Sequence, residues 1–449
     1  MEDHGSYLVS LEVETKVIIM SQTLKAVRGT RDLLPPETAL WNRIEATARD
    51  VFARYNFGEI RTPVFEDTAL FARGVGEETD IVSKEMYTWE DRARAQSEKT
   101  QSLTLRPENT AGVVRAAIEH NLFESGQLQK LYYIGPQFRR ERPQKGRYRQ
   151  FSQIGAEVIG PLSSGSESPL RDAEILEMLA TLLDELGISG WTLELNSVGS
   201  AADRARYNET LRAALVPVVG QMCADCQRRA VTNPLRVLDC KIPADQPIIE
   251  TLPVIADSLD EESKKHFAAV TAALDAAGVP YTLNHRLVRG LDYYTRTTFE
   301  FTHGGLGAQN ALLGGGRYDG LSEMLGGPRA PGIGFAMGED RLVLTLLAAL
   351  DQKSAVAQKA EAFIAPLGEG LNASALVLAR ELRHQGLWIE LGEGSFRLKK
   401  SFEAADKTAR HIVILGEDEL KSGILTVKNF STGIQTKVPR AELAVFLSN

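Results

Sequence analysis

The amino-acid sequence predicts an α+β protein in which a strand-rich core is interrupted by a helical segment and followed by a small α/β domain. Two strand-like segments, 128–141 and 149–160, are joined by a short basic loop, which is typical of one long antiparallel hairpin. Residues 199–281 are rich in helix-like stretches with charged and alanine-rich faces. From residue 361 strands and helices alternate, and this order favours a domain with a mostly parallel sheet.

Hydrophobic spacing defines the other elements. Apolar residues recur at helical spacing from Pro36 to Phe57, and Gly58 ends that helix. The sequence EIRTPVFE follows as a strand, in which Pro63 has no N–H to donate and indicates an edge or interface position. Further core elements are a helix over 169–186, strands over 102–106, 191–199 and 283–303, the segment ALLGGGRYDGL, and a strand that turns into a helix in PGIGFAMGEDRLVLTLLAAL. The tail predicts strands over 362–368, 387–392 and 411–416, helices from Ala373 and over 396–410, and a closing hairpin and helix.

The composition is that of a packed globular protein. Of 449 residues, 43% are apolar and 24% are charged. No apolar run approaches the ~20 residues that span a bilayer, and the chain does not open on a secretory signal pattern. Residues 1–22 show no period and indicate a dispensable, disordered extension, with an alternative start at Met20. We therefore expect a cytoplasmic multidomain protein.

Three cysteines in so long a chain argue against a disulfide framework and for a reducing compartment. Cys223, Cys226 and Cys240 could supply three of the four ligands of a zinc ion, with His266 as the fourth. Cysteine is more often used as a small buried apolar residue. We favour that interpretation over zinc.

Charge and glycine are unevenly distributed. The net charge is −8, but the segment 139–149 holds six basic residues and one acid, which makes a local positive field. Phosphate-binding loops of the GxxxxGK[ST] and GxGxxG types are absent, and the glycine runs at 304–307 and 314–316 indicate tight turns or close strand contacts. A bound nucleotide would therefore have to be held by arginines on an antiparallel sheet. The candidates are Arg139, Arg289 and Arg341.

Several segments resemble class II aminoacyl-tRNA synthetases, in particular the histidyl-tRNA synthetase family. GPQFRRERPQKGRYRQFSQIGAEVIG is similar to motif 2, and PGIGFAMGEDRLVL is similar to motif 3. LVRGLDYYTRTTFEF and ALLGGGRYDGL resemble the two signatures of the histidine enzymes, and KAVRGTRDLLPPE and RTPVFE resemble the N-terminus and motif 1. The resemblance runs from about residue 24 to the C-terminus, and LVRGLDYY with RYDGL is its most specific part.

The resemblance implies a class II synthetase fold: an antiparallel sheet core flanked by helices, with a helical insertion and a C-terminal α/β anticodon-binding domain. The implied ranges are 1–22 for the extension, 23–198 and 282–350 for the two parts of the catalytic core, 199–281 for the insertion and 361–449 for the anticodon-binding domain. It also implies a homodimer built through motif 1 that acts on tRNA(His), L-histidine and ATP. Mg²⁺ would enter with ATP as the substrate complex, and no cofactor would be permanently bound.

The implied reaction joins histidine to ATP as histidyl-adenylate with release of pyrophosphate, and then passes the histidyl group to the 3′ end of tRNA(His). Because the amino acid's carboxylate is already a nucleophile, activation needs charge stabilisation and alignment more than a general base. The resemblance makes Arg139 and Arg289 the catalytic residues at the α-phosphate, places Arg341 at the γ-phosphate and gives Arg147 an assisting contact to ATP. Protein carboxylates would do no more than assist ATP–Mg²⁺. The alternatives are a catalytically silent paralogue, such as a regulatory subunit of ATP phosphoribosyltransferase, and another class II ligase.

For histidine, the resemblance implies separate contacts to the ammonium and the imidazole. The ammonium contacts would be Glu108, Thr110 and Gln153, the imidazole contacts Glu157 and Tyr294, and the lining residues Tyr293 and Tyr318. Such polar matching rejects isosteres that lack the ring nitrogens. Asn109 also belongs to this pocket and stands where the family usually has glycine, and we expect it to adopt glycine-like backbone angles.

For tRNA, the resemblance implies that the motif 2 loop meets the acceptor end and that the insertion embraces the acceptor stem. The implied loop contacts are Arg142, Gln144, Lys145 and Arg149. Basic residues of the tail would add backbone contacts that weaken with salt, namely Arg397, Lys399, Lys400, Lys407 and Arg410. The charges of the tail nearly cancel, so a protein-interaction module is its alternative.

Overall fold

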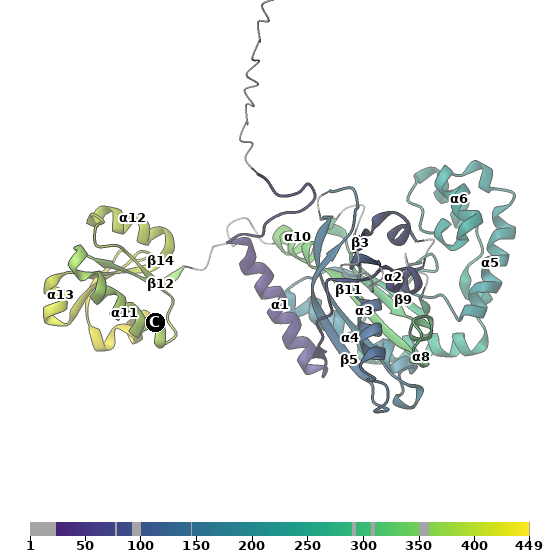
Figure 1. Cartoon of the computed structure of the whole chain (residues 1–449), viewed down its shortest axis with the longest axis horizontal. Helices are drawn as coiled ribbons and strands as arrows, with labels where there is room; N and C mark the ends of the chain where they lie inside the picture. The colour runs from purple at the N-terminus through teal and green to yellow at the C-terminus, as the bar shows by residue number, and fades with distance from the viewer. Residues whose placement is uncertain are drawn as a thin grey trace, which may run out of the picture. The chain divides into compact units, whose positions relative to one another are not determined.

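The computed structural model describes residues 24–76, 79–91, 100–144, 146–289, 293–306, 310–349 and 359–448 (Figure 1). The chain divides into two compact units, Met1–Gln352 and Lys353–Asn449, and each is described by itself. The extension predicted over 1–22 lies outside the described residues. Within the described ranges, no helix has both the length and the apolar character needed to cross a membrane.

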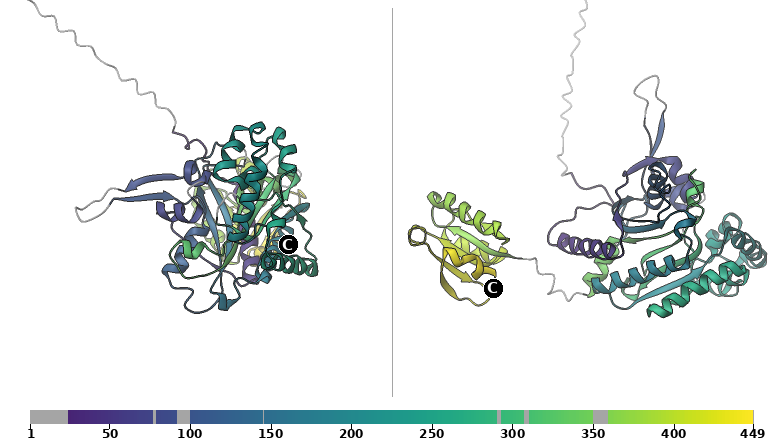
Figure 2. Two further views of the ribbon diagram at one scale, coloured as in Figure 1. Left: turned by 90° about the vertical axis from the view of Figure 1, so that its right-hand side faces the viewer. Right: turned by 90° about the horizontal axis from the view of Figure 1, so that it is seen from below.

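An eight-stranded sheet forms the centre of the first unit (Figures 1 and 2). Its order is β1-β5-β6-β11-β10-β9-β7-β8, with parallel pairing at the two edges and antiparallel pairing between all inner strands. The strands are β1 Gly58–Glu59, β5 Gln129–Phe138, β6 Gln150–Ile159, β7 Trp191–Ser197, β8 Thr282–Leu283, β9 Thr295–His303, β10 Ala311–Arg317 and β11 Gly332–Gly338. The predicted hairpin is confirmed, because β5 pairs with β6 from Gln129 opposite Ile159 to Phe138 opposite Gln150.

A three-stranded sheet of order β2-β4-β3 lies in the same unit, formed by β2 Phe65–Asp67, β3 Tyr87–Asp91 and β4 Gln101–Leu105. The single strand predicted over EIRTPVFE is wrong, because β1 and β2 belong to different sheets. Arg106 holds the chain between them: its Nη1 donates to the carbonyl oxygens of Thr62, at 3.0 Å, and Pro63, at 3.4 Å. Its Nε donates to Pro136 on β5. A buried side chain therefore replaces the ladder that Pro63 cannot complete.

Helices cover the apolar face of the large sheet (Figure 2). The four that share its core are α1 Glu37–Arg54, α4 Pro169–Leu186, α8 Glu261–Ala277 and α10 Glu339–Ala349. Helix α4 matches its predicted range, since Ser168 caps its start and Gly187, at φ 80°, ends it. Because strand side chains alternate, Ile154, Ala156 and Val158 point into this core while their neighbours on β6 point to the opposite face. That opposite face carries the candidate site.

Three shorter helices lie in the first unit outside that core: α2 Thr68–Val75, α3 Thr110–Glu119 and α9 Leu321–Met324. The helical segment predicted over 199–281 contributes α5 Ala201–Leu215, α6 Ala224–Thr232 and α7 Gln246–Glu250, which have a hydrophobic core of their own. Its last helix, α8, instead packs into the core of the large sheet through Val270 and Leu274.

The second unit is a five-stranded sheet of order β13-β12-β14-β15-β16 with helices. Its elements are β12 Ala360–Pro366, α11 Asn372–His384, β13 Ile389–Leu391, α12 Leu398–Thr408, β14 Ala409–Leu415, α13 Glu417–Ser422, β15 Ile424–Asn429, β16 Gln435–Pro439 and α14 Leu443–Ser448. The sheet is mixed rather than mostly parallel, because the predicted hairpin β15–β16 joins it with antiparallel pairing.

Candidate active site

A cavity of about 270 Å³ opens on the polar face of the large sheet. Its walls come from the loop that joins β5 to β6, from β6, from the segment around Arg289, and from β10, β11 and the start of α10. Its charged lining residues are Arg139, Glu141, Arg147, Arg289, Glu300, Asp340 and Arg341. The three arginines singled out from the sequence therefore meet in one cavity. Their catalytic roles stay predictions.

Arg289 lies across the glycine-rich strand β10. Its Nη1 donates to the carboxylate of Glu300 on β9, and the strand register places Glu300 directly opposite Gly314. A Cβ at Gly314 would stand 2.7 Å from Cζ of Arg289, so the guanidinium can occupy this position only because residue 314 is glycine. Burial acts most strongly and lowers the pKa of Arg289, but Glu300, Tyr294 and Tyr293 together outweigh it and the pKa is raised.

Arg139 enters the cavity from the end of β5. Its Nε donates to the carbonyl oxygen of Pro107 at 2.9 Å, and its Cζ lies 5.2 Å from the centre of the Phe151 ring. These two contacts fix the plane of the guanidinium. The Nη1 atom is 3.8 Å from Glu141, which also lines the cavity.

Arg147 and Arg341 complete the positive lining. Arg147 pairs with Glu141 at 3.0 Å, and Arg341 donates from Nη1 to the carbonyl oxygen of Ala311 at 2.6 Å. Burial lowers the pKa of Arg341, and the nearby charge of Arg147 lowers it further. Concentrated positive charge of this kind favours an anionic ligand with several charges.

Glu157 is a fully buried carboxylate in β6. Its Oε1 accepts from the hydroxyl of Thr110 at 2.8 Å and lies 3.4 Å from the hydroxyl of Tyr133, while Oε2 accepts from the hydroxyl of Tyr318 at 2.5 Å. Burial, reinforced by the charge of Glu108, raises the pKa of Glu157 to about 8. The ionised carboxylate can accept a hydrogen bond from an imidazole N–H.

Glycines on the neighbouring strands leave space for these side chains. A Cβ at Gly334, which lies opposite Glu157 on β11, would stand 2.6 Å from its Cδ. A Cβ at Gly316 would stand 2.8 Å from the ring of Tyr294, and one at Gly332 would likewise meet Tyr318. The prediction that the glycines 314–316 form a tight turn is therefore wrong. The alternative prediction, that they allow close contact with neighbouring strands, is correct. These glycines lie within β10, where the missing side chain makes room for the site.

Three tyrosines form a buried aromatic group beside Glu157. The ring centres of Tyr293 and Tyr294 are 4.7 Å apart, and those of Tyr293 and Tyr318 are 5.8 Å apart. Gln153 precedes Glu157 by four residues on the same face of β6, lines the cavity, and has an Oε1 without a hydrogen-bond partner among the described residues. Of the predicted histidine contacts, Gln153 thus lines the arginine-lined cavity.

Glu108 and Asn109, which precede α3, differ from the sequence prediction in their contacts and backbone conformation. Glu108 accepts from the backbone N–H of Thr110, at 2.7 Å, and of Ala111, at 3.1 Å, so it caps the helix, and burial raises its pKa. Asn109 has φ −118°, so the glycine-like angles expected for it are wrong. Its Oδ1 accepts from Thr62 at 2.7 Å, and within the described ranges its buried Nδ2 has no partner. A residue that begins a helix needs no left-handed conformation.

The residues predicted to contact tRNA differ in their surroundings. Arg142 and Gln144 are exposed on the motif 2 loop, and Lys145 lies outside the described residues. Arg149 instead anchors the start of the described chain: its N–H donates to Gly29 at 2.7 Å, and its side chain packs on that glycine. In the second unit the predicted basic residues are all exposed, namely Arg397, Lys399, Lys400, Lys407 and Arg410.

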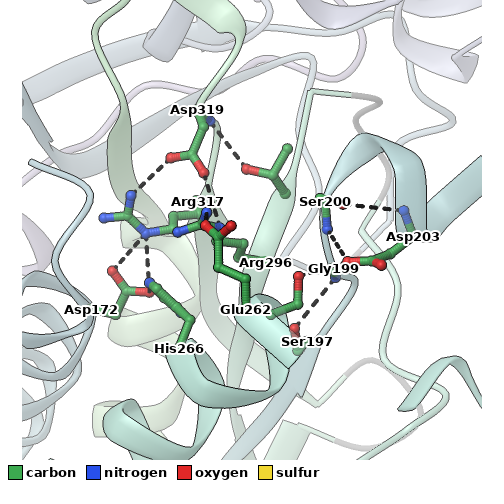
Figure 3. Close-up of polar contacts among 12 residues, drawn as sticks. Asp172, Ser197, Gly199, Ser200, Asp203, Glu262, His266, Arg296, Arg317 and Asp319 are labelled. Atoms are coloured by element: carbon green, nitrogen blue, oxygen red, sulfur yellow. Dashed lines mark hydrogen bonds and ion pairs between the residues drawn. The ribbon is translucent and has the colours of Figure 1, made fainter. Parts of the chain in front are cut away.

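A second arginine site is formed around Arg317, the residue before Tyr318 (Figure 3). Arg317 is fully buried between Asp172 of α4, at 2.9 Å, and Asp319, at 2.8 Å, and it also donates to the carbonyl oxygen of Ser166 at 2.6 Å. Nε2 of His266 on α8 lies 3.6 Å from Oδ2 of Asp172. His266 therefore belongs to this network and is not a ligand in the zinc alternative considered from the sequence. This network fixes the backbone from which Tyr318 reaches Glu157.

Sequence reasoning missed several of these residues. They are the carboxylates Glu141, Glu300 and Asp340 at the cavity, Tyr133 beside Glu157, and the pair Asp172 and Arg317. Glu300 carries a usable signal, because a charged residue between two phenylalanines of a strand must face away from the core. Asp172 carries none, since an acid in the first turn of a helix is ordinary.

Comparisons with known proteins agree with this geometry. The sequence model described as histidyl-tRNA synthetase matches residues 29–342, and the one described as anticodon binding domain matches residues 361–449. Proteins named histidine–tRNA ligase from Koribacter versatilis (strain Ellin345) and Solibacter usitatus (strain Ellin6076) are 72% and 55% identical, over 95% and 94% of this chain and 96% and 99% of theirs. The crystal structure of apo S. aureus histidyl-tRNA synthetase superposes with a TM-score of 0.76 at 37% identity, covering 95% of this chain and all of that one (100%). The predicted class II fold is confirmed, and the chain belongs to the histidyl-tRNA synthetase family.

Proposed function

We propose that this protein is a histidine–tRNA ligase. It activates histidine with ATP to give histidyl-adenylate and pyrophosphate, and then transfers the histidyl group to the 3′ end of tRNA(His). The observation that carries the proposal is the meeting of Arg139, Arg289 and Arg341 in one cavity next to Gln153 and Glu157.

In the first step, a carboxylate oxygen of histidine attacks the α-phosphorus, and the bond from that phosphorus to the bridging oxygen of pyrophosphate breaks. Arg139 and Arg289 both line the cavity, where they would stabilise the charge that develops on the α-phosphate oxygens. Arg341, with Arg147, would hold the γ-phosphate. The cavity carboxylates Glu141, Glu300 and Asp340 would be the protein groups available to assist the Mg²⁺ that arrives with ATP.

Histidine itself would lie between the β6 face and the tyrosine group. Glu157 would accept from one imidazole nitrogen, and Tyr294 would contact the other. Gln153, whose Oε1 has no hydrogen-bond partner in the described part of the chain, and Glu108 would accept from the ammonium. An amino acid without ring nitrogens could not make this hydrogen bond to Glu157, which is a basis for rejection.

The tRNA contacts extend beyond this cavity. Arg142, Gln144 and Lys145 of the motif 2 loop are proposed to meet the acceptor end, with Arg149 fixing the base of the loop. The residues matched by the anticodon-binding model carry exposed basic side chains suited to the phosphate backbone. A homodimer formed through the motif 1 segment is part of the proposal, and sedimentation of the purified chain tests it.

Histidine-dependent exchange of pyrophosphate into ATP tests the activity directly. Exchange with histidine and with no other amino acid is the expected result, and charging of tRNA(His) is the second readout. A chain that binds ATP but catalyses no exchange would favour the silent regulatory-subunit alternative. The two relatives at 72% and 55% identity carry the name of the ligase, which favours the active enzyme.

A further inference from the structure

The insertion contains a cluster of metal-ligating side chains that the proposed reaction does not use. Cys223 precedes α6 and Cys226 lies in its first turn, while Cys240 and Asp245 follow in the next two turns of the chain. One ligand atom from each of these four residues lies within 4.8 Å of the other three. They belong to the separate core of the insertion, remote from the His266–Asp172 contact.

The distances fit a tetrahedral ion. Zinc binds thiolate at about 2.3 Å, so two ligands at a tetrahedral angle lie roughly 3.7 Å apart. The Sγ atoms of Cys223 and Cys240 are 4.0 Å apart, and Sγ of Cys240 is 3.2 Å from Oδ2 of Asp245. A small contraction around an ion would bring all four atoms to bonding distance. No residue would have to change its place in the fold.

The surroundings are those of a closed site. Cys226, Cys240 and Asp245 are at most 5% exposed. Among the described residues, Asp245 forms no ion pair with a lysine or arginine, although its carboxylate is buried. Burying a carboxylate without a cation is costly, and a divalent ion would supply the missing charge.

Contacts behind the ligand atoms already hold them in place. Both carboxylate oxygens of Asp245 accept from the backbone N–H of Cys223, at 3.1 and 3.3 Å. The backbone N–H of Ile242 donates to Sγ of Cys240 at 3.4 Å, a contact that stabilises thiolate.

We propose that Cys223, Cys226, Cys240 and Asp245 form a structural zinc site in the insertion. The sequence favoured apolar packing of the cysteines over zinc, and the zinc alternative took His266 as the fourth ligand. In the structure the carboxylate of Asp245 stands beside the three thiols instead. With four protein ligands, of which Cys226, Cys240 and Asp245 are buried, the site leaves no open position for a substrate. Its effect is to tie the start of α6 to the chain that follows it.

The segment between Cys226 and Cys240, which the ion would hold in place, also contributes to a cavity beside Arg289. The chain between Cys226 and Cys240 includes Leu235 and Arg236, which line a small cavity of about 40 Å³ together with Arg289 and Tyr294. Loss of the ion would loosen this wall. The zinc site therefore supports the position of Arg289 from outside the sheet.

The test counts zinc in the full-length chain, purified under reducing conditions from zinc-replete cells, by plasma mass spectrometry. One zinc per chain is expected for the native protein and for the control Asp225→Asn, which removes an exposed carboxylate of the same helix. Asp245→Asn and Cys226→Ser should each weaken zinc retention by about tenfold or more. Chelation of the native protein should lower its Tm.

Titration with cobalt(II) keeps the test decisive if a variant fails to fold. Thiolate-to-cobalt absorption with the visible bands of a tetrahedral ion supports the site in the native chain. Absence of zinc together with absence of those bands overturns the proposal. A Cys223–Cys240 disulfide in the reduced preparation, detected by mapping of alkylated peptides, overturns it as well. None of these readouts depends on aminoacylation, so they are separate from the test of the proposed function.

Discussion

Arg289 and Arg317 stand in the two histidine-enzyme signatures, and both pair with carboxylates, yet their surroundings are opposite. The side chain of Arg317 is fully buried, and its three nitrogens donate to Asp172, Asp319 and Ser166. The side chain of Arg289 is 23% exposed, pairs with Glu300 and borders a cavity. An arginine whose donors are all satisfied by the protein holds the fold, whereas one that faces a cavity can hold a ligand. The following predictions separate the two roles.

Arg317→Met should produce the largest loss of stability. It leaves Asp172 buried without its guanidinium, and breaking a buried pair in this way typically costs about 3–5 kcal/mol. Urea unfolding would measure this as a fall in the free energy of unfolding. Arg228→Gln, which breaks an exposed pair with Asp225, is the matched control and should change stability little. A stable Arg317→Met protein with reduced activity would show that the two arginines do not differ in the way inferred.

Arg289→Ala should have the opposite signature. We expect pyrophosphate exchange to fall by about two to three decades, because one charge at the developing transition state is worth roughly 3–4 kcal/mol. Histidine affinity should stay within about an order of magnitude, and urea unfolding should change little. Equal losses in binding and in rate would mean instead that Arg289 holds the ground state.

Gly314→Ala should reduce pyrophosphate exchange in the same way as Arg289→Ala but less strongly, although it removes no charged group. The added Cβ would stand 2.7 Å from Cζ of Arg289 and must displace the guanidinium. Overpacking of this size costs about 1–3 kcal/mol, so exchange should fall roughly tenfold to a hundredfold. Gly58→Ala, where a Cβ would meet nothing within 4 Å, is the control in the same sheet. Full activity of Gly314→Ala would show that the position of Arg289 is adjustable.

The last prediction concerns the pH dependence of stability. In the unfolded chain Glu157 loses its proton near its ordinary pKa, but in the fold burial raises that pKa to about 8. The folded state therefore binds the proton more tightly, and this contribution to stability is lost as pH rises through that interval. Urea unfolding of the ligand-free protein between about pH 5 and pH 8 should show a smaller decline for Glu157→Gln. An identical decline in both proteins would mean that Glu157 is already ionised in the fold.

The sequence predicted the framework of the sheet well, because hydrophobic alternation and a basic hairpin loop are local signals. Helix α4 and the β5–β6 hairpin were predicted to within a few residues. The split of EIRTPVFE between two sheets was not, because it depends on Arg106 reaching back across more than forty positions to Thr62. The mixed sheet of the second unit likewise depends on where the β15–β16 hairpin docks.

The candidate site shows the same division. The cavity arginines could be selected from motif resemblance, and the structure brings them together. Their carboxylate partners could not, since the pairing of Arg289 with Glu300 is set by the strand register. Asp245 was missed as a metal ligand for a similar reason, because the spacing of cysteines does not show which oxygen the following turns bring beside them.

Helix α8 has a further consequence for how the helical insertion is attached. The segment from α5 to Leu259 has its own interior, but Val270 and Leu274 of α8 are packed with the large sheet, and His266 contacts Asp172. The inserted segment therefore forms a separate lobe only as far as Leu259. Helix α8, although it belongs to the insertion in sequence, already packs against the large sheet. An exchange of lobes between related proteins should keep residues 261–277 with the recipient, because a cut placed beyond them would remove part of the recipient's own foundation.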